Sequence, residues 1–153
     1  MLAGQVAAIS GAASERGIGR AIAKMFADHG AKVAILDRDS EGAERAARAL
    51  GDGHIGLGCD VTSVEQCRAA IRTTADRLGP LDILVNNAGI TQPLTTMEIG
   101  AKEYDAVMDV NLRGTLQLSQ AAIPGMRERG RGSIICISSV SAQRGGGIFG
   151  GPH

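Results

Sequence analysis

Short apolar runs along the chain alternate with longer stretches in which apolar residues recur at helical spacing. The runs are QVAAIS (5–10), KVAILD (32–37), HIGLGCD (54–60), LDILVNN (81–87) and SIICISS (133–139). They are continuously apolar, which is typical of strands covered on both faces of a parallel sheet. Between them the pattern predicts helices at 18–29, 41–50, 63–78 and 102–129. The sequence therefore predicts an α/β fold, a doubly wound parallel sheet in three α/β/α layers.

Local signals place several helix ends. Ser40 precedes an Ala-rich helical pattern and is the expected N-cap, with Gly51 as the stop. Ser63 and Gln66 have the spacing of a capping box at the start of the third helix. Pro124 interrupts the longest helical stretch, so we expect a kink or an early break there.

Composition and charge narrow the class of protein. With 153 residues, we expect one domain over 1–153. Apolar residues make up 44% of the chain but aromatic residues only 2%, so the core must be built from Ala, Val, Ile and Leu. The formal net charge is +0 and no basic run is present, which argues against a nucleic-acid or anionic membrane partner. No segment approaches the roughly 18 continuous apolar residues of a membrane span.

The cysteines and the N-terminus bear on the compartment. Cys59, Cys67 and Cys136 are odd in number and lack CxxC spacing, which favours reduced, mostly buried thiols over disulfides or a zinc site. The opening residues MLAGQVAAIS have no basic segment and a short apolar stretch, so they predict a strand rather than a signal peptide. We therefore expect a cytoplasmic protein without a metal site.

A glycine-rich loop, SGAASERGIG at residues 10–19, joins the first predicted strand to the first helix. Gly11 can adopt backbone angles forbidden to other residues, and Gly17 and Gly19 allow close approach of a ligand and of the sheet. Asp37 follows 20 residues after Gly17, at the end of the second strand. A strand, a glycine loop, a helix and a distal acid together predict a dinucleotide site, with the pyrophosphate at the helix N-terminus.

Charged residues near this loop bear on the choice of dinucleotide. The Asp37 carboxylate would accept hydrogen bonds from the ribose hydroxyls of NAD and would repel the 2′-phosphate of NADP. Arg16 and Arg38 are cations that could pair with that phosphate. The sequence favours NAD, with NADP as the alternative.

Five motifs occur in a characteristic order: SGAASERGIG, CDV at 59–61, NNAG at 86–89, VNLRG at 110–114 and ISS at 137–139. In these motifs the chain resembles the short-chain dehydrogenase/reductase family over essentially its whole length. The resemblance implies a Rossmann-like fold, of which the chain would hold the first five strands. It also implies hydride transfer between a nicotinamide cofactor and a ketone or secondary alcohol.

The resemblance assigns roles to individual residues. Asp60 and Val61 would border the adenine, and the NNAG segment would steady the fourth strand and line the cofactor pocket. Asn111 matches the asparagine that holds a water in the proton relay, and Ser139 matches the serine that hydrogen-bonds the substrate oxygen, with Ser138 and Ser141 as alternatives. The expected cofactor site comprises Ser10, Gly11, Arg16, Gly17, Ile18, Gly19, Asp37, Arg38, Asp60, Val61, Asn87, Ala88 and Gly89.

The chain departs from the family pattern in three places. Ser14 and Glu15 look like an insertion in the glycine loop, and Ser10 replaces the usual threonine. The family also has a Tyr, followed four residues later by Lys, about 13 residues after the serine. Tyr104 is the one tyrosine here, Met108 stands four residues after it, and it lies upstream of Asn111, so we expect Tyr104 to pack on the long helix instead.

The last residues, GGGIFGGPH, resemble the loop that leads to that missing Tyr motif. We therefore expect a C-terminally truncated chain that is inactive alone, from a parent oxidoreductase that assembles as a homodimer or homotetramer. A 3-oxoacyl reductase is one possible parent. The alternative hypothesis is a non-catalytic dinucleotide-binding or interaction module.

Overall fold

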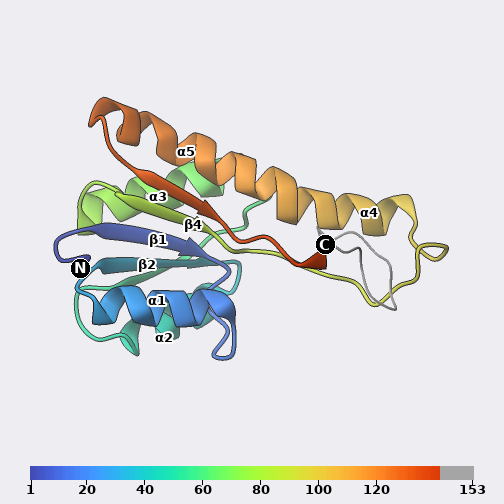
Figure 1. Cartoon of the computed structure of the whole chain (residues 1–153), viewed down its shortest axis with the longest axis horizontal. Helices are drawn as coiled ribbons and strands as arrows, with labels where there is room; N and C mark the ends of the chain where they lie inside the picture. The colour runs from blue at the N-terminus through green and yellow to red at the C-terminus, as the bar shows by residue number, and fades with distance from the viewer. Residues whose placement is uncertain (142–153) are drawn as a thin grey trace.

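A five-stranded parallel sheet forms the centre of the computed structural model, which describes residues 1–141 (Figure 1). The strand order is β3-β2-β1-β4-β5. The strands are β1 (Val6–Ser10), β2 (Lys32–Asp37), β3 (Ile55–Gly58), β4 (Ile83–Asn86) and β5 (Ser133–Cys136). All five predicted strands are confirmed; β2 matches its apolar run in full, and the other four are shorter than theirs. The order is that of a Rossmann-like fold.

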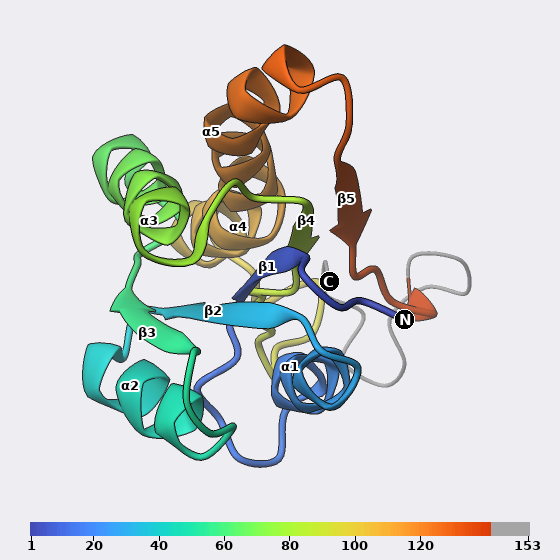
Figure 2. The ribbon, with the colours of Figure 1, turned by 90° about the vertical axis from the view of Figure 1, so that its left-hand side faces the viewer.

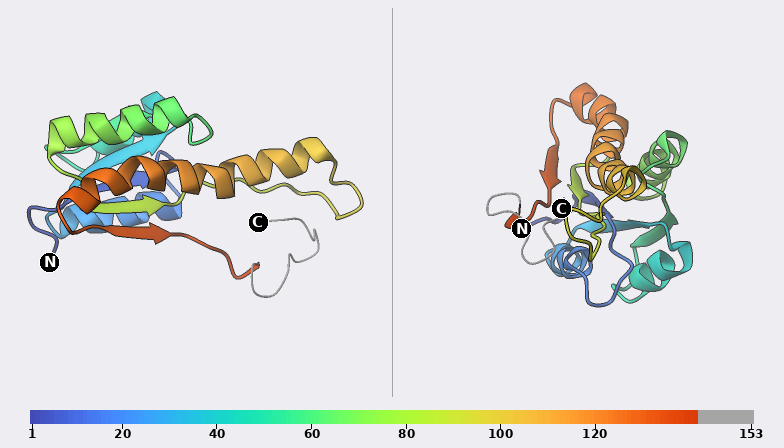
Figure 3. Two further views of the ribbon diagram at one scale, coloured as in Figure 1. Left: turned by 90° about the horizontal axis from the view of Figure 1, so that it is seen from above. Right: turned by 90° about the vertical axis from the view of Figure 1, so that its right-hand side faces the viewer.

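Helices cover both faces of the sheet. Figure 2 shows α1 and α2 on one face and α3, α4 and α5 on the other. Their bounds are α1 (Ile18–Asp28), α2 (Ser40–Arg48), α3 (Val64–Leu78), α4 (Ala101–Met108) and α5 (Gly114–Glu128). A short π-helix, η1 (Asp109–Arg113), joins α4 to α5. The helix expected over 102–129 is thus three elements, which run on in one line beyond the end of the sheet (Figure 3).

Two separate apolar clusters explain why the strands are apolar at every position. Along β1, Ala7 and Ile9 belong to the cluster beneath α1 and α2, whereas Ala8 belongs to the cluster beneath α3 and α5. The same alternation in β2 assigns Ile35 to the first cluster and Leu36 to the second. Successive strand side chains point to opposite faces, so a sheet covered twice needs apolar residues throughout.

The strand order reverses between β1 and β4. From β1 the chain winds outward through β2 to β3, and α3 then returns it to the other side of β1, where β4 pairs in parallel. The loops that leave the carboxyl ends of β1 and β4 therefore diverge. Open α/β sheets bind ligands in the crevice at such a reversal.

One predicted helix cap is wrong, and so is the early break expected at Pro124. Asp39, not Ser40, caps α2, because its Oδ1 accepts a hydrogen bond of 2.9 Å from the Gly42 amide. Pro124 lies inside α5 and does not end it. Proline removes one intrahelical hydrogen bond, and the carbonyl that loses it belongs to exposed Gln120, where water can satisfy it. Half of the predicted capping box forms at α3: Ser63 accepts from the Gln66 amide at 3.3 Å, but the Gln66 side chain accepts from the Asp60 amide instead of the Ser63 amide.

β5 differs from the other strands in its exposure. It pairs with β4 on one side, and Ile134, Ile135 and Ile137 are 37%, 41% and 38% exposed. The strands β1, β2 and β4 are instead buried along almost their whole length. Among the helices of residues 1–141, none combines the length and apolar character needed to cross a membrane.

Candidate functional site

The glycine loop leaves β1 through a backbone conformation that favours glycine. Gly11 has φ +64°, and a Cβ on it would lie 2.7 Å from the Ala88 Cα. The Gly11 amide donates to the Leu36 carbonyl at 2.8 Å, so the loop is fixed between the ends of β2 and β4. The sequence prediction of special backbone angles at Gly11 is confirmed.

Hydrogen bonds lock this loop to the segment after β4. The Ser10 hydroxyl accepts from the amides of Asn87 and Ala88, both at 3.0 Å. In return the Asn87 side chain donates to the carbonyls of Ser10 and Gly11, both at 2.9 Å. A Cβ at Gly19 would lie 2.5 Å from the Asn87 Nδ2, so the start of α1 packs directly against the Asn87 side chain. The loop, α1 and the segment after β4 therefore form one rigid unit.

The N-terminus of α1 has the features of an anion site. Gly17 is its N-cap residue, and the first turn carries no acidic side chain. The unpaired amides of a helix start and the helix dipole favour a negative group there. The two extra residues of the loop lie in an exposed turn, closed by the Gly17 amide on the Ser14 carbonyl at 3.3 Å. This turn precedes the Gly17 N-cap and leaves the start of α1 intact.

Asp37 ends β2 with its carboxylate held by two backbone amides. Its Oδ2 accepts from Ala13 at 3.0 Å and its Oδ1 accepts from Asp39 at 3.1 Å. Each carboxylate oxygen has a second lone pair, so both can still accept from a ligand hydroxyl. The side chain is fixed in direction, which suits recognition of a vicinal diol.

The turn after β3 closes the other side of the crevice. The Asp60 Oδ1 accepts from the Thr62 amide at 2.9 Å and from the Thr62 hydroxyl at 2.8 Å. Gln66 accepts from the Asp60 amide at 2.9 Å, and buried Val61 lies against Gly114 at the start of α5. The turn is thereby tied to both α3 and α5.

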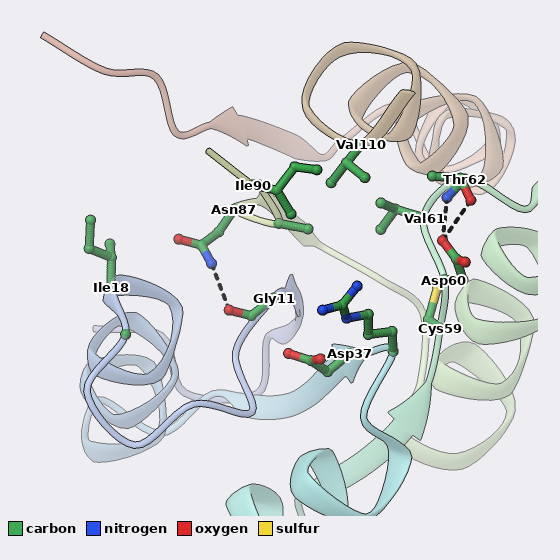
Figure 4. Close-up of a pocket in the computed structure, with 14 residues that line it drawn as sticks. Gly11, Ile18, Asp37, Cys59, Asp60, Val61, Thr62, Asn87, Ile90 and Val110 are labelled. Atoms are coloured by element: carbon green, nitrogen blue, oxygen red, sulfur yellow. Dashed lines mark hydrogen bonds between the residues drawn. The ribbon is translucent and has the colours of Figure 1, made fainter. Parts of the chain in front are cut away.

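These segments enclose a pocket of about 450 Å³ at the carboxyl ends of the strands (Figure 4). The residues that line it and were expected from the sequence are Gly11, Gly17, Ile18, Asp37, Arg38, Asp60, Val61, Asn87, Ala88 and Gly89. Lining residues that sequence reasoning missed are Cys59, Thr62, Ile90 and Val110. Cys59 and Val110 belong to the CDV and VNLRG motifs, and Thr62 and Ile90 adjoin motif residues, so the motifs were the available signal.

Three expected cofactor residues lie outside the pocket lining. Ser10 is buried at 1% exposure, and its hydroxyl accepts a hydrogen bond from the amide of Asn87, which does line the pocket. Gly19 lies in α1 against the same asparagine. Arg16 lines a separate depression beside α1 together with Arg20 and Lys24, whereas Arg38 lines the main pocket. The two arginines considered for a 2′-phosphate therefore do not line the same cavity.

Asn111 lies in the π-helix and binds a loop rather than a neighbouring helix. Its Oδ1 accepts from the Ile90 amide at 2.8 Å, and its Nδ2 donates to the Ile90 carbonyl at 3.0 Å. The Thr115 hydroxyl donates to the Asn111 carbonyl at 2.9 Å. These bonds connect η1 to the segment that lines the pocket, and π-helical turns are frequent at functional sites.

Ser139 lies after β5 and is exposed, with its hydroxyl accepting from the Ser141 amide at 3.1 Å. Tyr104 lies on α4, the first part of the long helical stretch, and is 48% exposed. Cys59 and Cys67 are buried free thiols, as expected, but Cys136 is exposed. Within residues 1–141 no three His, Cys, Asp or Glu side chains converge as metal ligands would.

Comparison with known proteins tests the family directly. The profile described as short chain dehydrogenase matches residues 5–150. The chain belongs to this family. A short-chain type dehydrogenase/reductase of Sinorhizobium fredii, y4mP, is 54% identical over 157 residues, covering 100% of this chain and 62% of that protein. The 3-oxoacyl-[acyl-carrier-protein] reductase FabG of Vibrio cholerae is 39% identical, covering 94% of this chain and 58% of its own length.

A solved structure also supports membership of the short-chain dehydrogenase family. The 3-ketoacyl-(acyl-carrier-protein) reductase of Brucella melitensis, crystallised with NADH, superposes with a TM-score of 0.89 at 38% identity. The match covers 94% of this chain and 61% of that one. The chain thus spans about three fifths of the length of these relatives. The expected family and Rossmann-like fold are confirmed.

Proposed function

We propose that this chain is the cofactor-binding part of an NAD(P)-dependent oxidoreductase that prefers NAD. One observation carries the proposal: the acid-free N-terminus of α1, the Gly11 backbone and the fixed Asp37 carboxylate face a single pocket. Amides at a helix start suit a pyrophosphate, and a carboxylate at the end of β2 suits a ribose diol. The pocket therefore offers hydrogen-bond donors for the pyrophosphate and an acceptor for the ribose of a dinucleotide.

Each side of the pocket has a distinct task in this proposal. The α1 amides bind the pyrophosphate, Asp37 accepts from the adenosine ribose, and the Asp60–Val61 turn borders the adenine. Asn87, Ala88 and Gly89 line the far side. When bound, the nicotinamide would supply or accept the hydride. Ser139 would hydrogen-bond the substrate oxygen, and Asn111 would hold a relay water.

A charge argument favours NAD over NADP. The carboxylate of Asp37 lies in the pocket with both oxygens held by backbone amides, so it cannot easily turn away from a 2′-phosphate. The negative charges of the Asp37 carboxylate and of a 2′-phosphate bound beside it would repel each other. Arg38 shares the pocket, but Arg16 does not, so a two-arginine clamp on the phosphate has no support here.

Replacement of the carboxylate tests this preference. In the Asp37→Asn variant the negative charge is lost, and NADH binding should weaken about tenfold because roughly one charged hydrogen bond is lost. NADPH binding should strengthen in the same variant. Exposed Asp52 lies in a turn away from the pocket, so Asp52→Asn is the matched control and should leave both affinities unchanged. Unchanged affinities in Asp37→Asn would contradict the assignment, as would weaker NADPH binding in an Arg16→Gln variant.

For the whole protein we propose reduction of a ketone or oxidation of a secondary alcohol. The relatives include proteins named 3-oxoacyl-[acyl-carrier-protein] reductase and D-threitol dehydrogenase at 39% and 40% identity, which support the reaction class more than any one substrate. NADH oxidation should be measured with 3-oxoacyl thioesters, simple ketones and keto-sugars. A rate that disappears in Ser139→Ala while NADH still binds would support the role of that serine.

We further propose that the 153 residues alone bind the cofactor without turning over substrate. Tyr104 is followed at the fourth position by Met108, so the proton-transferring Tyr and Lys pair of the family has no match in the sequence. Any robust NADH-dependent rate from the verified chain would overturn this. Binding without a rate in the longer protein as well would favour the non-catalytic module.

The assembly proposed for the protein is a homodimer or homotetramer in the cytoplasm. Leu112, Leu116 and Ile123 are 60%, 54% and 38% exposed along one stretch of η1 and α5. Their spacing of four and seven residues brings them to one helix face, where a second copy could cover them. Leu116→Lys should reduce the mass measured by light scattering toward that of a monomer. An unchanged mass would contradict this interface.

A further inference from the structure

Two thiols lie on either side of the turn that closes the pocket. Cys59 directly follows β3 and is 2% exposed, and Cys67 lies at the start of α3 and is 0% exposed. The Cys67 thiol donates to the Val61 carbonyl at 3.5 Å and lies 3.9 Å from the Asp60 carbonyl oxygen. Both side chains belong to the same buried cluster. They are therefore neighbours beneath the Asp60–Val61 turn.

The two sulfur atoms also interact with each other. The Cys59 thiol shares a hydrogen bond with the Cys67 sulfur, which raises the pKa of Cys59 and lowers the pKa of Cys67. Cys67 lies near the N-terminus of α3, where the helix dipole favours a thiolate.

The pocket gives a route to Cys59, the thiol of the pair that lines it. Cys59 lines it beside Asp60, Val61 and Thr62, as Figure 4 shows. A molecule the size of water or hydrogen peroxide can enter a pocket of about 450 Å³ without any change in the fold. A bound adenosine on the Asp60–Val61 turn would cover the same route. Hydride transfer uses neither thiol.

We propose that Cys59 and Cys67 form a dithiol that peroxide oxidises to a disulfide through the cofactor pocket. The Cys59 sulfur, which lines the pocket, attacks one oxygen of hydrogen peroxide, the O–O bond breaks, and the hydroxide that leaves takes up the Cys59 thiol proton as water. Cys59 is then a sulfenic acid. The Cys67 sulfur attacks the Cys59 sulfur, loses its proton, and displaces the hydroxyl as a second water. Two thiols and one peroxide thereby give one disulfide and two waters.

The bridge would alter the turn that borders the adenine. A disulfide brings two sulfurs to about 2.05 Å, closer than any hydrogen-bonded contact. Cys67 would also lose the thiol proton that it donates to the Val61 carbonyl. The pair thus couples the redox state of the protein to the shape of one wall of the pocket, and a small dithiol would reverse it.

Peptide mapping of the protein that carries this chain tests the proposal. Residues 49–68 contain both cysteines and no internal Lys or Arg, so trypsin releases them in one peptide. After mild peroxide treatment and alkylation without reductant, this peptide should be two hydrogens lighter and carry no alkyl group. Exposed Cys136 lies in a different peptide and serves as the internal control. Cys67→Ser should abolish the mass loss, because Cys59 then has no second thiol with which to form the bridge.

Saturating NAD⁺, which peroxide does not oxidise, supplies the second arm. It should slow oxidation of the pair but leave Cys136 unaffected. This arm rests on the proposed function, and a separate titration of NAD⁺ binding distinguishes failure of that function from failure of the pocket route. Oxidation at Cys136 with a fully alkylated 49–68 peptide would overturn the dithiol. Equal oxidation of the pair with and without bound NAD⁺ would overturn the route.

Discussion

β2 and β5 are strands of one sheet, but they differ in what surrounds them. Ile35 in β2 is fully buried between β1 and β3, whereas Ile135 in β5 is 41% exposed on a strand that has one neighbour within residues 1–141. The polar residues follow the same division. Ser10 is buried with its hydroxyl bound three times, whereas exposed Ser139 accepts one bond from Ser141.

This difference distinguishes the pocket proposed for the cofactor from the serine proposed for the substrate. The cofactor pocket is assembled from β1 to β4 by contacts within the described chain, and its residues hold one another in place. The serine proposed for the substrate lies where the sheet offers little support. The proposed nucleotide site is thus held together by contacts within residues 1–141, whereas Ser139 has little support from the sheet beside it.

The largest expected effect comes from matched truncations in the two strands. Ile35→Ala should lower the free energy of unfolding by about 3 to 4 kcal/mol, because it removes buried methyl groups and leaves a cavity. Ile135→Ala should cost less than about 1 kcal/mol, because its side chain is already partly in water. Urea denaturation of both variants measures this. Equal losses would show that β5 is as well packed as β2.

The next largest effect compares the two serines. Ser10→Ala leaves the amides of Asn87 and Ala88 without their acceptor and should cost about 2 to 3 kcal/mol, together with weaker NADH binding. Ser10→Thr keeps the hydroxyl and should restore most of both. Ser139→Ala should change stability by less than about 0.5 kcal/mol. If Ser10→Ala changed neither the free energy of unfolding nor NADH binding, the hydrogen bonds of the Ser10 hydroxyl would not be what holds the pocket together.

A smaller effect is expected from pH. The Val33 amide donates to the His54 Nδ1 at 3.1 Å, and partial burial lowers the pKa of His54. The folded state thus binds the proton less readily than the unfolded state, so this contribution is complete above the ordinary histidine pKa of about 6.5 and is lost as the pH falls below it. The melting temperature should decline from pH 7 to pH 5.

A non-titrating replacement isolates this contribution. His54→Asn keeps an acceptor for the Val33 amide and should make the decline shallower. His29→Asn, at the exposed end of α1, is the control and should retain the full decline. If the melting temperature of the wild type, His54→Asn and His29→Asn varied with pH in the same way, His54 would not be the cause of the decline.

Much of the nucleotide side could be predicted, because strand ends and loop spacing are local properties of the sequence. Gly11 and Asp37 follow apolar runs whose edges are sharp, and their positions in the pocket agree with that. The π-helix around Asn111 could not be predicted, since Asp109–Arg113 has an ordinary helical pattern. Asp39 and Ser40 are adjacent and equally suited to capping, so only the geometry distinguishes them.

Other features depend on contacts distant in the chain. Pro124 carries a strong local signal, but its effect on α5 depends on whether solvent reaches the carbonyl one turn earlier. The contact between Cys59 and Cys67 requires α3 to pack back on the end of β3, which no spacing rule encodes. The exposure of Cys136 likewise follows from β5 lying at the edge of the described sheet.

Titration of the wild-type protein with NADH and with NADPH tests the central claim most directly. The account predicts that NADH binds at least about tenfold more tightly, because Asp37 accepts from the ribose hydroxyls and repels a 2′-phosphate. Binding by a correctly folded chain of neither dinucleotide, or tighter binding of NADPH, would contradict it.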